Sequence, residues 1–240
     1  MKFGHYSDNQ LPVFDHSDLD PELYTLNSHG YRCQEFPTKS LEGGKNTVVL
    51  GCSHTFGIGS STEELWVNRL EQKLANPRLR FWNLGQPGAS GDLIVRILYA
   101  TEKILYPDIV LVCWPHATRR ERLEAPNTRN LIADELLATE TEDTDNQTFL
   151  KNVFFVNKFA EKRNAKAFHC FAEEDYHEHI GDLQTLSTYT IANCWPYWNK
   201  FEQRKRYDKP SLAKDGQHYG VEHHKRFAEL FLERFAVKLR

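Results

Sequence analysis

Short apolar strands alternate with amphipathic helices through the first half of the chain, and this alternation limits the possible folds more than any other feature. The pattern predicts strands at 47–50, 79–84 and 109–113, separated by helices at about 61–75 and 90–105. Helices between consecutive apolar strands imply right-handed crossovers and a parallel sheet covered on both faces. We therefore expect an α/β three-layer sandwich with a central parallel sheet of about five strands. A further strand at 165–171 and a final helix at 220–239 fit this architecture.

The 240 residues are short enough for one such domain. Residues 1–45 are rich in Asp, Pro, Asn and Ser and have no sustained periodicity, which predicts an irregular N-terminal arm before a domain at 46–240. The regions 120–150 and 173–210 are poorly periodic, so we interpret 120–150 as a loop or insertion. Aromatic residues between Tyr189 and Phe201 could line a sugar or acyl pocket, or pack in the core.

Composition excludes several classes of protein. A net charge of −3 is unlike that of a general nucleic-acid binder, and the apolar runs are too short to cross a membrane. Five scattered cysteines without a CxxC pair argue against a disulfide framework and a Cys-rich zinc site. The N-terminus has no apolar signal region, so we expect a cytoplasmic protein. A virion protein, or one exported without a signal, would show the same features.

Ser53 is the first candidate for chemistry. It lies just after the first strand, within the glycine-flanked run 51–57. Ligands bind at the carboxyl ends of strands in open parallel sheets, so a hydroxyl there would face a site. The alternative is a helix-capping or turn serine. The run 83–88 follows the second strand and contains Gly85 and Gly88, whose N–H groups could donate to an oxyanion. Its alternative is a turn that simply needs glycine.

Asp215 and His218 form the last candidate pair, in a loop before the final helix. A carboxylate beside an imidazole fixes its tautomer and stabilises the imidazolium. The alternative is a polar helix-entry turn capped by Asp215. Other histidines carry weaker signals. The run 223–226 reads as a solvated helix face. His169, Asp175, His177 and His179 could ligate a metal, but a polar surface loop is the favoured interpretation, and we predict no metal site.

Together the runs 48–57, 83–88 and 215–218 resemble, in order and position, the first, second and last sequence blocks of the SGNH (GDSL-like) hydrolase superfamily. The segment Asn27-Ser28-x-Gly30-x-Arg32 is similar to one that precedes the serine block in some members. The resemblance implies a flavodoxin-like fold and a serine esterase that needs no metal or organic cofactor. Its substrate would be an acetyl or short acyl ester, most plausibly on a carbohydrate. Charge and apolar run length, as argued above, predict no nucleic-acid or membrane partner.

The resemblance also implies roles for individual residues. Ser53 would be the nucleophile, His218 the general base and Asp215 the group that orients the imidazole. The remaining assignments are oxyanion donors at Ser53, Gly88 and His116, and substrate contacts at His54 and Asn83.

The third block departs from the family pattern. Members usually follow the third strand with Gly-x-Asn-Asp, whose Asn completes the oxyanion hole, but this chain continues with Trp114-Pro115-His116. His116 or Thr118 could donate instead. Loss of one oxyanion donor typically costs about 10²–10³ in rate. The departure therefore leaves a second hypothesis beside the esterase: a non-catalytic or weakly catalytic module with a binding or structural role, for example in a virion. Acyl transfer to an acceptor other than water also remains open.

Overall fold

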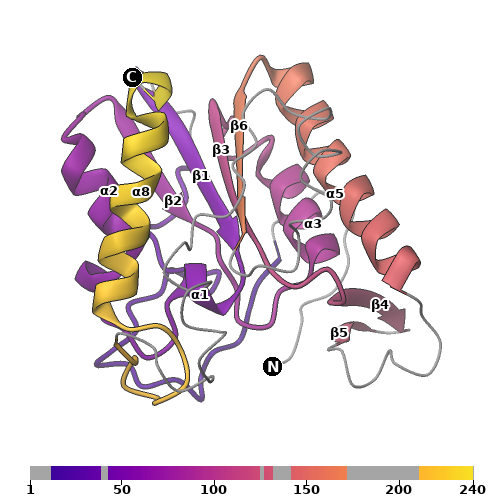
Figure 1. The fold of residues 1–240 in the computed structure, drawn as a ribbon, viewed down its shortest axis with the longest axis horizontal. Helices are drawn as coiled ribbons and strands as arrows, with labels where there is room; N and C mark the ends of the chain where they lie inside the picture. The colour runs from indigo at the N-terminus through magenta and orange to yellow at the C-terminus, as the bar shows by residue number, and fades with distance from the viewer. Residues whose placement is uncertain (1–11, 39–42, 125–126, 132–141, 172–210, 240) are drawn as a thin grey trace.

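The computed structural model describes residues 12–38, 43–124, 127–131, 142–171 and 211–239. Within them, a parallel sheet of four strands has the order β2-β1-β3-β6 (Figure 1). Its strands are β1 (Lys45–Gly51), β2 (Leu79–Asn83), β3 (Ile109–Trp114) and β6 (Lys166–Phe171). This order matches the first four positions of a flavodoxin-like sheet. The predicted strands and their parallel arrangement are confirmed.

Helices cover both faces of this sheet (Figure 1). One face packs against α2 (Trp66–Leu74) and α8 (Val221–Leu239), and the other against α3 (Gly91–Thr101) and α5 (Glu142–Arg163). Successive strand residues point to opposite faces. Val48 and Leu50 therefore join the α3–α5 core, whereas Val49 joins the α2–α8 core. This alternation produces the expected three layers. None of the described helices is long and apolar enough to span a bilayer.

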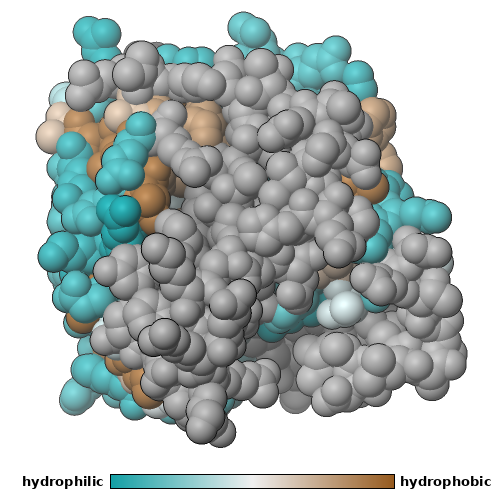
Figure 2. Space-filling view, viewed as in Figure 1, coloured by the Kyte–Doolittle hydropathy of each residue, from teal (hydrophilic) through white to brown (hydrophobic). Residues whose placement is uncertain are grey.

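The visible outer surface agrees with this layering. In the space-filling view, hydrophilic residues predominate along the margin formed by α2 and α8, with a smaller hydrophobic area between them (Figure 2). The apolar stripe of α2, made of Trp66, Val67, Leu70 and Leu74, is buried against the sheet.

The polarity of 120–150 predicts a loop or insertion, but the described part of this region is not a continuous loop. It contains an antiparallel hairpin of β4 (Arg120–Glu124) and β5 (Asn127–Leu131), and α5 begins at Glu142 rather than near Phe149. The first turn of α5 is polar and has no apolar periodicity. Its Asp145 is nonetheless buried, because its carboxylate accepts hydrogen bonds from Arg120 across the chain.

The interpretation of His223 and His224 as a solvated face is wrong. Both side chains are 1% exposed. A capping box of Ser61 and Glu64 starts a 3₁₀ turn, η1 (Thr62–Glu64), ahead of α2. The N–H of Trp66 in the first turn of α2 then donates to Nδ1 of His224 at 3.2 Å. The first N–H groups of a helix need acceptors outside that helix. His224 provides one for α2 and is therefore buried in the interface between α2 and α8.

Candidate active site

Ser53 lies where β1 turns into the short helix α1 (Ser53–Phe56), at the carboxyl end of a central strand. Its side chain is 7% exposed, and neither its hydroxyl nor its N–H makes a hydrogen bond to the described residues. A Cβ at Gly51 would lie 2.1 Å from Oγ1 of Thr55, so only glycine fits beside the helix. Gly57 ends the helix with φ +83°, a left-handed conformation that favours glycine. The two glycines therefore allow the tight turn that presents Ser53.

The turn after β2 packs directly against α1. Asn83 is buried, and its side-chain amide donates to the carbonyl of Thr55 at 2.8 Å while its Oδ1 accepts from Gly85 N–H at 3.1 Å. Gly88, with φ +68°, faces open space, and its N–H makes no hydrogen bond to the described residues. Asn83 thus holds the turn in place, and its contact with a substrate stays a prediction. Gly88 leaves an N–H available to a ligand.

Asp215 and His218 form a hydrogen-bonded pair, with 2.5 Å between Oδ2 and Nδ1. The other carboxylate oxygen accepts from the backbone N–H groups of Gln217 and His218, each at 3.0 Å. Partial burial raises the pKa of Asp215, but the hydrogen bonds from His218 and Gln217 and the charge of His218 outweigh it and lower the pKa overall. An ionised carboxylate only accepts, so Nδ1 carries the proton and Nε2 of a neutral ring is left with a lone pair. The pair thus has the tautomer that a general base needs.

Two contacts bring the Asp215–His218 loop against the serine block. The carbonyl of Gly59 accepts from Lys214 N–H at 2.9 Å, and a Cβ on Gly59 would lie 3.0 Å from the backbone nitrogen of Asp215. The ring of His54 packs edge-on against that of His218, with 5.6 Å between centroids. No hydrogen bond joins Ser53 to His218 within the described residues. The loops are therefore adjacent, whereas the nucleophile–base contact is not formed.

The segment after β3 lies at the same edge of the sheet. His116 is half-buried there, and its carbonyl accepts from Arg119 N–H at 3.1 Å. Its assignment to the oxyanion hole stays a prediction.

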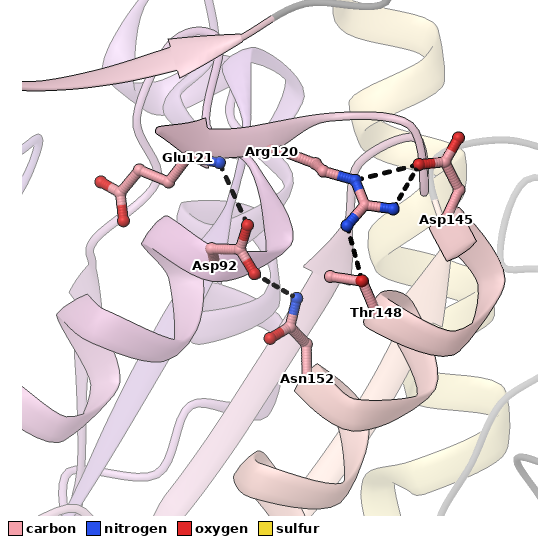
Figure 3. Close-up of polar contacts among 6 residues, drawn as sticks. All are labelled: Asp92, Arg120, Glu121, Asp145, Thr148 and Asn152. Carbon is pink, nitrogen blue, oxygen red and sulfur yellow. Dashed lines mark hydrogen bonds and ion pairs between the residues drawn. The ribbon is translucent and has the colours of Figure 1, made fainter. Parts of the chain in front are cut away.

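A polar network then fixes β4 over the N-terminal halves of α3 and α5 (Figure 3). The guanidinium of Arg120 donates to Oδ1 of Asp145 from two nitrogens, at 3.0 and 2.6 Å, and to Oγ1 of Thr148 at 2.6 Å. Asp92 accepts from Glu121 N–H and from the Asn152 amide, both at 3.0 Å. Both helices begin at the carboxyl edge of the parallel sheet. The hairpin is therefore anchored to the side of the site that carries Gly88.

His169 lies inside β6 and is fully buried, so the surface interpretation is wrong for this residue. Its Nδ1 accepts from the indole N–H of Trp114 at 3.1 Å, because an indole nitrogen only donates. Nε2 therefore carries the proton and donates to Oδ1 of Asn157 at 2.9 Å. Burial lowers the pKa of His169 to about 3. Asp175, His177, His179 and the aromatic run 189–201 lie outside the described residues, and the described part of the chain holds no metal-ligand cluster.

A cavity of about 280 Å³ opens at the β2 edge, between the N-terminal arm and α2. Arg32, Asn68 and Asn83 contribute to its lining, but Ser53 and His218 do not. The cavity is thus separate from the serine block.

Two of the three comparisons with known proteins found no match: neither a family model nor a curated protein sequence matches this chain. Solved structures do. TesA matches with a TM-score of 0.57 and 15% identity, covering 79% of this chain and 97% of that one. A member of the lipolytic protein G-D-S-L family from Veillonella parvula matches with a TM-score of 0.51 and 11% identity, covering 79% of this chain and 97% of that one. A catalytic mutant of the acetylxylan esterase Axe2 from Geobacillus stearothermophilus matches with a TM-score of 0.52 and 11% identity, covering 82% of this chain and 96% of that one. The chain therefore has the α/β fold of the SGNH (GDSL-like) esterases.

Proposed function

We propose that this protein is a serine esterase that acts through Ser53, His218 and Asp215. The observation that carries the proposal is the Asp215–His218 pair, which is bonded at 2.5 Å and packs against His54, the residue next to Ser53. A carboxylate, an imidazole in the required tautomer and an unbonded hydroxyl on adjacent loops are the components of nucleophilic acyl transfer.

The reaction would proceed in two halves. Oγ of Ser53 attacks the carbonyl carbon of the ester while Nε2 of His218 takes the hydroxyl proton. The bond to the alcohol oxygen then breaks, and His218 returns the proton to that oxygen. Water attacks the acyl-serine with His218 again as base, which releases the carboxylic acid and restores the hydroxyl. Asp215 keeps the ring oriented and stabilises the imidazolium throughout.

The tetrahedral oxyanion would be held by the N–H groups of Ser53 and Gly88. Both groups lack a hydrogen-bond acceptor among the described residues, which is what a preorganised oxyanion hole requires. His116 is the proposed third donor, in place of the missing block-three Asn. The proposed substrate carries an acetyl or short acyl group.

A carbohydrate ester is the proposed natural substrate. The support comes from fold neighbours only, among them an acetylxylan esterase. Function does not follow from fold, so this assignment depends on a direct substrate test.

Turnover of p-nitrophenyl acetate and butyrate by the wild type and by Ser53→Ala tests the proposal. We expect wild-type turnover, with greater activity on acetate, and its loss in Ser53→Ala. Replacement of an exposed arm serine, Ser17→Ala, is the matched control and should leave the rate unchanged. A serine-reactive fluorophosphonate should label the wild type and not Ser53→Ala. Equal rates in the wild type and Ser53→Ala, without labelling, would refute the esterase.

The second candidate is a non-catalytic binding or structural module with this fold. Two observations favour it: Trp114-Pro115-His116 replaces the block that usually carries the oxyanion Asn, and Ser53 makes no hydrogen bond to His218. This module would bind an acylated or free oligosaccharide without consuming it. Calorimetry with acetylated xylo-oligosaccharides, followed by mass analysis of the recovered ligand, distinguishes the two functions.

A further inference from the structure

The guanidinium of Arg32, in the N-terminal arm, is bound to the loop that follows the serine helix. Nη1 donates to three carbonyls of this loop, those of Phe56 at 3.1 Å, Gly57 at 2.8 Å and Ser60 at 3.0 Å. Nη2 donates to Oγ1 of Thr62 at 3.1 Å and to the carbonyl of Leu23 at 3.3 Å. One side chain of the N-terminal arm therefore contacts most of the segment 56–62.

The arrangement is unusual for a buried cation. Arg32 is 3% exposed, yet its hydrogen bonds all go to neutral acceptors, and it forms no ion pair with the described residues. The guanidinium is instead enclosed by aromatic rings, with Tyr24 and Phe56 centroids at 5.0 and 5.6 Å. Nε is buried without a hydrogen-bond partner among the described residues. A buried charge is costly unless it is hydrogen-bonded, so the two Nη groups hold the loop carbonyls against the guanidinium.

The arm holds the same loop at a second point. The hydroxyl of Tyr24 accepts from Gly59 N–H at 2.7 Å, and its ring stacks on Phe56. The arm is itself braced, because Oδ1 of Asn27 accepts from the N–H groups of His29 and Tyr31, both at 3.0 Å. These bonds fix the backbone immediately before Arg32.

Gly59 then connects the arm to the acid–base loop. Its N–H is bound by Tyr24, while its carbonyl accepts from Lys214 N–H, next to Asp215. The fit is close, since a Cβ on Gly59 would meet Oδ1 of Asp215 at 3.1 Å. A shift of the loop must therefore be passed on to the carboxylate that orients His218.

We propose that Arg32 and Tyr24 are positioning residues, which set where the Asp215–His218 pair stands relative to Ser53 through the loop 57–60. This inference rests on the proposed esterase function. It gives the segment 27–32 a role in the site although none of its residues reaches the reacting atoms.

Two substitutions test the inference without large loss of packing. Tyr24→Phe removes only the acceptor of Gly59 N–H, and Arg32→Lys keeps the charge but cannot reproduce the fork of five hydrogen bonds. A misplacement of about 1 Å costs about 10²-fold in rate. We expect kcat to fall about 10²-fold in Arg32→Lys and about tenfold in Tyr24→Phe, with KM near the wild-type value.

Arg69→Ala is the matched control. Arg69 is half-buried in α2 and donates Nε to the carbonyl of Glu64 at 3.0 Å, outside the loop 57–60. Removing it should lower the melting temperature as a structural arginine does, while kcat and KM stay at wild-type values.

A second readout does not depend on turnover. The proton between His218 and Asp215 should give a far-downfield resonance, assigned by its absence in Asp215→Asn. We expect Arg32→Lys and Tyr24→Phe to shift or broaden this resonance, and Arg69→Ala to leave it in place. Folded Tyr24→Phe with wild-type kcat and an unmoved resonance would overturn the inference. If the wild type hydrolyses no ester, the esterase proposal fails, and the resonance alone decides whether the arm positions the pair.

Discussion

Acidification should destabilise this protein through His169, whose buried ring must stay neutral to accept from Trp114. Both ring nitrogens are committed, one as acceptor from the indole and one as donor to Asn157. A second proton would leave the indole N–H facing another donor in a site without water access. Burial accordingly lowers the pKa of His169 to about 3.

Acid lowers the free energy of unfolding because the unfolded chain binds more protons than the native state. The unfolded chain titrates His169 near 6.5, so between about 3 and 6.5 it binds a proton that the native state does not. The stabilisation that comes from the neutral His169 ring is therefore fully present above that pH window and is lost as the pH falls through it. At pH 5, about 1.5 units below the unfolded pKa at about 1.36 kcal/mol per unit, the loss is about 2 kcal/mol. Burial, with nearby positive charges, also lowers the pKa of His224 to about 3, which adds a similar loss.

Urea unfolding at pH 7.5 and pH 5.0 measures this loss, with His169→Asn as the test variant. The variant should be less stable than the wild type at pH 7.5, by about 1–3 kcal/mol, because Asn157 loses its partner. Its further loss between the two pH values should be smaller than that of the wild type by about 2 kcal/mol. Phe149→Leu is the control, since it disturbs the edge-on contact with Trp114 but removes no titrating group. It should retain the wild-type difference.

An equal pH dependence in the wild type and His169→Asn would refute the reasoning. It would mean that His169 takes up a proton in the native state, and that its hydrogen bond from Trp114 does not govern its titration. A smaller dependence in Phe149→Leu as well would point to loosened packing as the cause.

Three further outcomes are expected. Asp215→Asn should keep the fold but lower kcat by about 10³–10⁴-fold, because an amide permits the wrong tautomer of His218; steady-state kinetics that show under tenfold loss would contradict this. Gly59→Ala should reduce kcat and the melting temperature together, since φ is +74° and a Cβ meets the Asp215 backbone at 3.0 Å; an unchanged kcat would argue against coupling of the two loops. Arg120→Ala should lower the free energy of unfolding by about 2–3 kcal/mol, because it leaves the buried Asp145 carboxylate without its cation. Urea unfolding measures that change, with Asp145→Asn as its partner variant, and additive losses in the double variant would contradict a direct interaction.

The sequence by itself determined the layered architecture and the location of the candidate site. Strand and helix periodicities depend on local residue spacing, so β1, β2, β3 and β6 could be predicted with their parallel arrangement. The blocks around Ser53, Gly88 and Asp215–His218 were visible because each is a short contiguous run. Their proposed roles follow from the resemblance and await the kinetic tests.

Tertiary structure alone decided how distant residues are used. Nothing local indicates that Arg32 binds the carbonyls of 56–60, that His224 accepts from the first turn of α2, or that Asp145 draws Arg120 over α5. From the sequence alone, each of these polar side chains would be expected to face solvent. Each is buried because a backbone group or charge far along the chain needs a partner where water is excluded. That requirement exists only once the layers have packed, which is why periodicity could not predict it.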